Sequence, residues 1–187
     1  MVSCDKIRES VEEALRRHDR GAVIVVEVPD DVFLASKVEC INMLVRSGAD
    51  GVYLSLEEPG GAAPPFRQAG PGFGRVSVIS PSQKAPGPGT IRISPDAGVD
   101  EMVGALQASL LSIKNPKKII ITDSFERLLR SNSLAEAMRL CEFLSRLVRR
   151  REVAGVIIAI RSSSPMKGFI EQIAVQADEV LRMDAGS

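Results

Sequence analysis

The chain alternates between short, nearly uninterrupted apolar runs and longer segments in which apolar residues recur three or four positions apart. The short runs are typical of strands buried on both faces of a parallel sheet, and the longer spacing indicates amphipathic helices. Because the two kinds of segment alternate, the sequence predicts an α/β domain of three layers around a mainly parallel sheet. The predicted strands are 22–28, 51–56, 75–79, 90–94, 118–122, 153–160 and 179–183. The predicted helices lie within 1–20, 34–45, 99–113, 133–151 and 170–175.

Glycine and proline are concentrated in residues 59–98, which hold 8 of the 15 glycines and 8 of the 11 prolines. Segments such as Pro59–Gly61 and Ala85–Gly89 sustain neither a helix nor a strand ladder. The strands predicted on either side belong to one sheet, so we expect an insertion lying over its carboxyl edge, not an interdomain linker. All 187 residues are expected to form a single domain.

Composition and the placing of cysteines and charges argue against several functional classes. The 24 Lys+Arg balance the 24 Asp+Glu, which argues against a broad electrostatic footprint for nucleic acid or an anionic membrane. The three cysteines show no CxxC spacing, so neither a zinc ribbon nor a disulfide framework is indicated. The charged start, Met1–Lys6, lacks the apolar core of a secretory signal, and no apolar run has the length of a membrane span. We therefore expect a cytoplasmic protein.

Candidate chemistry lies where the predicted strands end, because ligands of open parallel sheets bind at the carboxyl ends of the strands. Three such ends carry polar residues, namely 27–34, 53–59 and 119–124. The second holds the paired acids Glu57 and Glu58, and the third ends in Asp123-Ser124.

These segments resemble the RecA-like ATPases, most closely the KaiC-like branch found in archaea and bacteria. Tyr53–Glu58 resembles the strand that ends in paired glutamates, and Ile119–Ser124 resembles the Walker B strand. Ile170–Met183 is similar to the closing segment, in which a helix leads into an Ala-Asp pair and a final strand. The similarity spans residues 22 to 184. It implies a RecA-like fold of the P-loop NTPase type.

The sequence departs from that family at its P-loop (Walker A), which would lie between the first strand and the following helix. Counting back from Tyr53 without gaps places the P-loop lysine at Phe33 and the adjacent Ser/Thr at Leu34. The loop glycines would correspond to three non-glycine residues, and no glycine occurs anywhere in residues 22–47. The residues at the degenerate P-loop position are Pro29, Asp30, Asp31, Val32, Phe33 and Leu34.

Physical chemistry predicts that this loop does not hold a triphosphate. A P-loop works because glycines let backbone N–H groups curl around the phosphates, while lysine neutralises charge and Ser/Thr holds magnesium. Asp30 and Asp31 would repel the phosphates and would themselves satisfy the helix N-terminus. Two other features could stand in for the P-loop only weakly. Lys37, a candidate for the missing P-loop lysine, is interpreted as a solvated helix lysine, and Gly70–Gly74, a candidate phosphate loop, is interpreted as a plain loop.

The remaining acids have two interpretations. The resemblance implies that the paired glutamates, Glu57 and Glu58, are candidates for the base that activates water, and that Asp123 assists magnesium. Together with Asp30 and Asp31 they form a set of five acids suited to a divalent metal through oxygen ligands. Alternatively, these acids cap helix starts and turns. This second interpretation is favoured for Asp30, Asp31 and Asp123, and the two interpretations are evenly balanced for Glu57 and Glu58.

Arginines are concentrated late in the chain, with seven between Glu126 and Arg151. A solvated helix face whose cations suit the helix C-terminus is the favoured interpretation, and a weak contact to an anion or nucleic acid is the alternative. The loop Arg161–Ser164 follows a strand end, where it is placed to touch a ligand or a neighbouring subunit.

The sequence therefore favours a degenerate RecA/KaiC-like protein that regulates or scaffolds through protein–protein contact. Its expected partner is a second copy of itself or a catalytic RecA-like relative, and no cofactor is expected. One alternative is an ATP-binding protein or weak ATPase that holds ATP and Mg²⁺ at a non-standard site. A second is a nucleic-acid accessory module that uses the arginine-rich helix.

Overall fold

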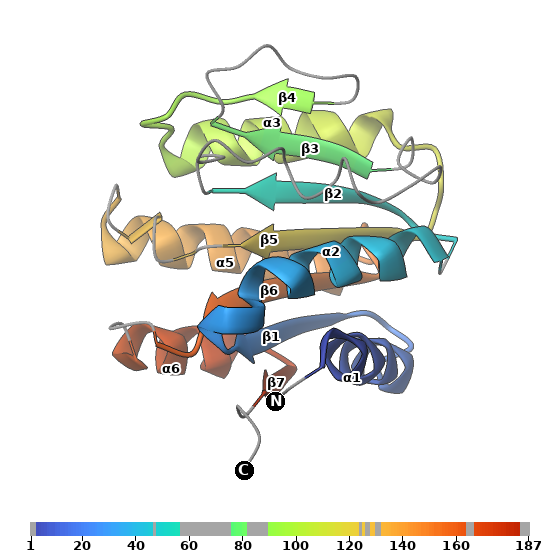
Figure 1. The fold of residues 1–187 in the computed structure, drawn as a ribbon. Helices are drawn as coiled ribbons and strands as arrows, with labels where there is room; N and C mark the ends of the chain where they lie inside the picture. Colours follow the sequence, from blue (N-terminus) through green and yellow to red (C-terminus); the bar gives the residue numbers. More distant parts are fainter. Residues whose placement is uncertain are drawn as a thin grey trace.

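A seven-stranded sheet, with every pair of neighbouring strands parallel, forms the middle layer of the computed structural model (Figure 1). The strand order is β4-β3-β2-β5-β6-β1-β7. The strands are β1 (Ala22–Val28), β2 (Asp50–Ser55), β3 (Val76–Ser80), β4 (Thr90–Arg92), β5 (Lys118–Asp123), β6 (Gly155–Arg161) and β7 (Glu179–Arg182). The structure describes residues 3–46, 48–56, 76–81, 90–123, 125, 128–129, 132–163 and 167–183.

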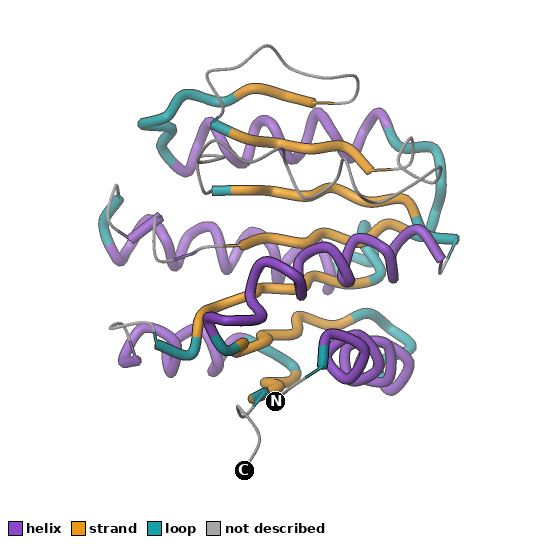
Figure 2. The backbone as a smooth tube through the Cα atoms, viewed as in Figure 1, coloured by secondary structure: helices purple, strands orange, loops and turns teal. Residues whose placement is uncertain are grey.

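Helices cover both faces of this sheet and complete the three predicted layers (Figure 2). They are α1 (Cys4–Arg17), α2 (Asp30–Arg46), α3 (Val99–Ser112), α5 (Leu134–Arg149) and α6 (Lys167–Gln176). Helices α1 and α2 pack on one face, whereas α3, α5 and α6 pack on the other. Successive strand residues point to opposite faces of the sheet. Ile24 and Val26 therefore pack in the core beneath α1 and α2, and Val23 and Val25 pack in the core beneath α3, α5 and α6. Burial on both faces explains the continuous apolar runs of the sequence.

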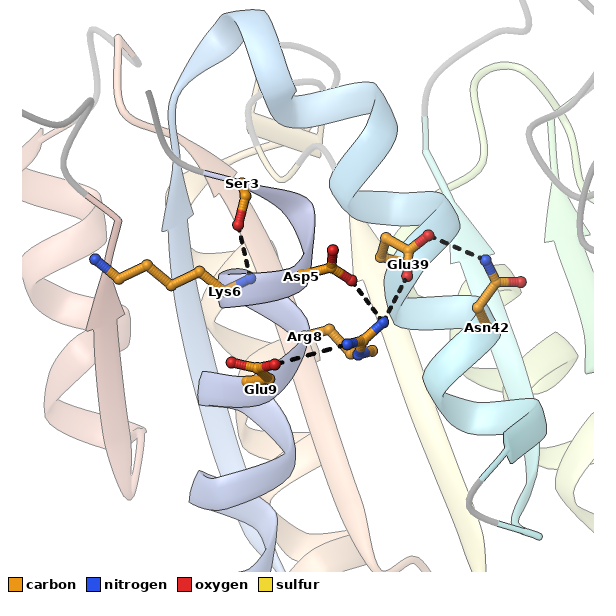
Figure 3. Close-up of polar contacts among 7 residues, drawn as sticks. All are labelled: Ser3, Asp5, Lys6, Arg8, Glu9, Glu39 and Asn42. Carbon is orange, nitrogen blue, oxygen red and sulfur yellow. Dashed lines mark hydrogen bonds and ion pairs between the residues drawn. The ribbon is translucent and has the colours of Figure 1, made fainter.

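Helix α1 is fixed to α2 by one arginine as well as by apolar packing. Its Ile7, Val11 and Ala14 are buried, as the helical spacing predicted. The Arg8 guanidinium lies 2.7 Å from the Asp5 carboxylate in its own helix and 3.5 Å from the Glu39 carboxylate of α2 (Figure 3). Helix α1 is thereby held on the face of the sheet that α2 also covers.

Part of the Gly/Pro-rich stretch 59–98 belongs to the sheet. Strand β3 pairs with β2, and β4 pairs with β3, so these two strands extend the sheet on one side. This confirms the two short strands predicted there, and it corrects the view of the whole stretch as an insertion over the carboxyl edge. Residues 59–75 and 82–89 lie outside the described part of the chain.

None of the helices in the described part of the chain combines the length and the apolar character that a bilayer crossing requires.

The three cysteines are free thiols, and two of them are buried in the helix layers. Burial raises the pKa of Cys40 to about 12, and the neighbouring Glu39 carboxylate adds to that shift. Burial also raises the pKa of Cys141 to about 12, with Glu142 contributing. The pKa of Cys4 is raised by burial and by Glu39 and Asp5, although its side chain is partly accessible. Since the thiolate is the reactive form, both buried thiols should be inert in the folded protein.

We expect one thiol, Cys4, to react with an aromatic disulfide reagent at pH 8, and Cys40 and Cys141 to react only after unfolding. The measurement is the number of thiols released before and after addition of denaturant, with Cys4→Ser as the control that abolishes the early phase. Two or three reactive thiols in the native protein would contradict the burial of these side chains.

The raised pKa values of Cys40 and Cys141 also determine the direction in which the free energy of unfolding changes with pH. As the pH rises above the ordinary thiol pKa of 9.0, the unfolded chain loses its thiol protons before the folded one does. These two thiols therefore lower the free energy of unfolding as the pH rises from about 9 towards 12. Denaturant titrations at pH 8 and pH 10 should show a smaller loss for the double variant Cys40→Ala/Cys141→Ala than for the native chain.

Candidate functional site

The turn between β1 and α2, where the resemblance places the P-loop, contains one residue. Strand β1 ends at Val28 and α2 begins at Asp30, so Pro29 alone connects them. Its carbonyl accepts a hydrogen bond from the Val32 N–H at 3.2 Å, inside the first turn of the helix. A phosphate-binding loop needs a run of free backbone N–H groups between strand and helix. Pro29 has no N–H, and the strand and helix leave no further residues for such a loop.

The first turn of α2 is acidic and is tied to the end of β6. Asp30 and Asp31 are both exposed. The Ser163 hydroxyl donates a hydrogen bond to the Asp30 carboxylate, and the Ser162 N–H donates to the Val28 carbonyl at 2.9 Å. The polar loop after β6, predicted to touch a ligand or subunit, thus contacts the start of α2 in its own chain.

Phe33 fills the interior of this turn. Its side chain is 1% exposed, at the position that the resemblance assigns to the P-loop lysine. The Lys37 Nζ lies 4.6 Å from the ring centroid, and the Arg161 Cζ lies 4.4 Å from it. Both distances are within the range of cation–π attraction. Two cations are therefore present near the P-loop position, and both lie against an aromatic ring.

Lys37 also forms a buried ion pair with Asp123. The distance from Lys37 Nζ to Asp123 Oδ2 is 2.6 Å, and the two residues are 5% and 0% exposed. This corrects the interpretation of Lys37 as a solvated helix lysine. One turn separates it from Phe33, so both side chains lie on the same side of α2, the side that packs on the sheet. A buried carboxylate at the end of β5 then draws the ammonium inward.

Strand register brings Tyr53 to the same carboxylate. Strands β2 and β5 pair in parallel, with Tyr53 beside Ile121 and Ser55 beside Asp123. The Tyr53 hydroxyl donates a hydrogen bond to Asp123 Oδ2, and the Leu56 N–H donates to Oδ1 at 3.2 Å. Three donors, from α2, from β2 and from the residue that follows β2, thus converge on one acid and satisfy both of its oxygens. A buried carboxylate needs such partners to stay ionised.

This arrangement determines what the site can do chemically. The charge of Lys37 is neutralised by Asp123, and an incoming phosphate would have to compete with that carboxylate at 2.6 Å. A metal ion at Asp123 would likewise have to compete with the ammonium and the phenol hydroxyl. The described residues contain no group of three or more His, Cys, Asp or Glu side chains that is arranged to hold a metal.

The sequence-predicted residues are brought together only in part. Asp123 and Phe33 lie within the same buried set, whereas the side chain of Leu34 is 61% exposed. Glu57 and Glu58, the candidate bases, lie outside the described residues, and so does Ser124. The gathering of the paired glutamates with Asp123 at this edge stays a prediction.

Sequence reasoning missed Tyr53 and Arg161 as members of this set. Tyr53 is the sole tyrosine of the chain and stands inside an apolar strand, where a hydroxyl requires a partner. That isolated polar atom was the signal for a buried acceptor. Arg161 gave no comparable signal, because its position over Phe33 depends on how α2 crosses the end of β6.

The arginine-rich helix α5 begins with the predicted capping box, in which Ser133 and Glu136 satisfy each other's backbone N–H groups. On its exposed side, Arg139 pairs with Asp100 of α3 at 2.7 Å. This contact agrees with the favoured interpretation of a solvated face. Arg149 and Arg150 lie at its C-terminal end, and Arg151 follows.

Removal of the ammonium should destabilise the protein strongly. Lys37→Met leaves Asp123 buried without its counter-ion, which typically costs about 3–5 kcal/mol. We expect a decrease of this order in the free energy of unfolding, measured by urea titration followed by circular dichroism. The double variant Lys37→Met/Asp123→Asn should recover part of the loss, because the remaining amide carries no charge.

Lys6→Met is the matched control, since Lys6 is an exposed lysine on α1. Surface substitutions of this kind usually change stability by less than about 0.5 kcal/mol. Equal effects of Lys37→Met and Lys6→Met would show that the buried pair does not hold α2 in place.

Comparison with known proteins identifies the fold. No family model matches the sequence, and no curated protein matches it. Among solved structures, the crystal structure of the RadB recombinase is similar, with a TM-score of 0.52 and 15% sequence identity. The match covers 86% of this chain and 73% of the RadB chain. The chain therefore has the three-layer α/β/α fold of the RecA-like proteins.

Proposed function

We propose that this chain is a RecA-like protein whose nucleotide site is filled by its own side chains, and that it regulates or scaffolds through protein–protein contact. The observation that carries the proposal is the buried set at the end of β1, in which Phe33 occupies the lysine position while Lys37 pairs with Asp123. The fold is that of an ATPase family, and the site's chemistry is changed.

Loss of the backbone cradle is the first support. In a P-loop the phosphates are held mainly by backbone N–H groups, and the loop's glycines make that wrapping possible. Here the helix follows the strand after Pro29 alone, and its first turn presents Asp30 and Asp31. Two carboxylates at a helix N-terminus stabilise it in place of a bound anion.

Internal neutralisation of charge is the second support. Triphosphate binding needs a cation for the phosphates and an acid for magnesium. In this chain the cation and the acid that stand nearest to those roles, Lys37 and Asp123, are bound to each other in a buried pair. Binding of Mg·ATP would have to break that pair and leave each partner with a new ligand.

Contact between RecA-like domains supplies the proposed role. The resemblance implies side-by-side association, and the solved neighbour is named a recombinase. Two large apolar side chains are exposed at the carboxyl edge of the sheet, Leu34 at the start of α2 and Leu134 at the start of α5. We propose that this edge meets a second copy of the chain or a catalytic RecA-like relative.

We expect no binding of ATP or ADP to the purified chain, because the site is closed by Phe33 and by the Lys37–Asp123 pair. The measurement is isothermal titration calorimetry with each nucleotide and Mg²⁺ at millimolar concentration, together with thermal-shift assays. Neither heat of binding nor a rise in melting temperature should be observed. An ATP affinity in the micromolar range, lost in Lys37→Met and retained in Lys6→Met, would contradict the proposal and favour an ATP-binding protein with a non-standard site.

Association can be tested separately by sedimentation velocity over a wide range of protein concentration. We expect concentration-dependent association that weakens by about tenfold when Leu34→Glu places a charge at the apolar contact, since one buried leucine contributes roughly 1.5–3 kcal/mol. Leu111→Glu is the control, because Leu111 is also exposed but lies at the C-terminal end of α3, at the opposite edge of the sheet. A monomer at every concentration would contradict self-association.

A further inference from the structure

A second site lies at the opposite edge of the sheet, where the strands begin. A pocket of ≈ 300 Å³ opens between the C-terminal ends of α5 and α6 and the amino end of β1. Its volume is in the lower range of sites that hold small organic ligands. Strand direction separates this pocket from the Lys37–Asp123 pair, which lies at the carboxyl edge.

The lining of this pocket is strongly basic. Arg20, Arg149 and Arg151 contribute to it, against the single carboxylate of Asp178. The Asp178 carboxylate accepts a hydrogen bond from the Val23 N–H at 2.8 Å. Among the described residues, none gives the side chains of the three arginines an ion pair or a hydrogen bond. Three guanidinium groups that gather around one concave surface favour an anion there.

Two buried polar atoms in the pocket have no partner. Ser145 is 6% exposed, and its hydroxyl forms no hydrogen bond. The Gln176 Oε1 is also buried and unpaired. Buried polar groups are nearly always satisfied, and an exception calls for an explanation such as a missing ligand. The Gln176 oxygen only accepts, so the missing molecule must carry a donor for it, whereas the Ser145 hydroxyl can pair with either an acceptor or a donor.

The backbone at Arg151 is strained at the same place. Its φ is 59°, which makes it the one non-glycine residue with positive φ in the described chain. The Arg151 N–H donates to the Val148 carbonyl at 2.9 Å, so the residue ends α5 in the left-handed turn that glycine usually occupies. A glycine would adopt this conformation without strain, whereas the arginine places a guanidinium at the pocket.

We propose that this pocket binds a small organic molecule through an oxyanion, either a phosphate monoester or a carboxylate. The oxyanion is held by Arg149, Arg151 and the Ser145 hydroxyl, and a hydroxyl or N–H group of the same molecule donates to Gln176 Oε1. The side chains of Val23 and Val148 supply the apolar part of the lining. This site is independent of the filled nucleotide site.

The test is calorimetry on the full chain at constant ionic strength with three probes: ribose 5-phosphate, malate and inorganic phosphate. Ribose 5-phosphate and malate each carry an oxyanion and a hydroxyl group, whereas phosphate is the bare anion. We expect one of the two organic probes to bind at least about tenfold more tightly than inorganic phosphate, since it also satisfies Gln176. Which of the two binds distinguishes a phosphate ester from a carboxylate.

Two variants separate ligand contact from structure. Arg151→Gly relieves the left-handed strain, so its melting temperature should be unchanged or higher, while probe affinity falls by about tenfold or more. Ser145→Ala removes an unpaired hydroxyl and should likewise retain stability while weakening the probe. Arg150→Gln is the matched control, because Arg150 follows the same helix without lining the pocket.

Three outcomes would overturn the proposal. The first is the absence of binding by every probe at millimolar concentration. The second is an equal loss of affinity in Arg150→Gln and Arg151→Gly, which would indicate general charge attraction. The third is salt-dependent binding of duplex DNA that requires Arg149 and Arg151 while no small probe binds, which would assign these arginines to a nucleic-acid surface.

Discussion

The buried pair of Lys37 and Asp123 determines how the first helix after β1 sits on the sheet. The acid ends β5, two strands away from β1, and β6 lies between them. The apolar side chains of α2, Phe33 and Ile41 among them, pack closely on this surface, and the ion pair at 2.6 Å adds a directional contact that favours the same register. The cost of removing two charges from water is offset because Tyr53 and Leu56 also donate to the carboxylate.

The same pair links fold and chemistry. A nucleotide-binding site of this fold keeps its cation and its metal-assisting acid apart, so that a charged ligand completes the set. Here the two groups complete each other, and the aromatic ring of Phe33 occupies the remaining interior. The two opposite charges of this site are therefore paired within the chain itself.

The fold could be predicted from the sequence because it rests on patterns of several residues. Runs such as Ala22–Val28 and the spacing of Ile7, Val11 and Ala14 each carry redundant information, and every predicted strand and helix is confirmed in type. The positions of Phe33 and Asp123 near strand ends could be read from the sequence, but the contacts that these two side chains make could not. A lysine in a helix is ordinarily exposed to solvent, so the sequence gives no sign that Lys37 is buried. Only the way α2 crosses over β5 brings Lys37 to Asp123. The unpaired Ser145 and the left-handed Arg151 have no sequence signature, since both depend on atoms that tertiary packing places nearby.

Arg8 connects the position of α1 to that of α2 through an ion pair. It connects α1 to Glu39, and Glu39 stands on the same helix as Lys37, little more than half a turn further on. A movement of α2 that drew Lys37 away from Asp123 would therefore pull on α1 through this arginine. Through this ion pair the N-terminal helix helps to hold α2 in the position that keeps Lys37 beside Asp123.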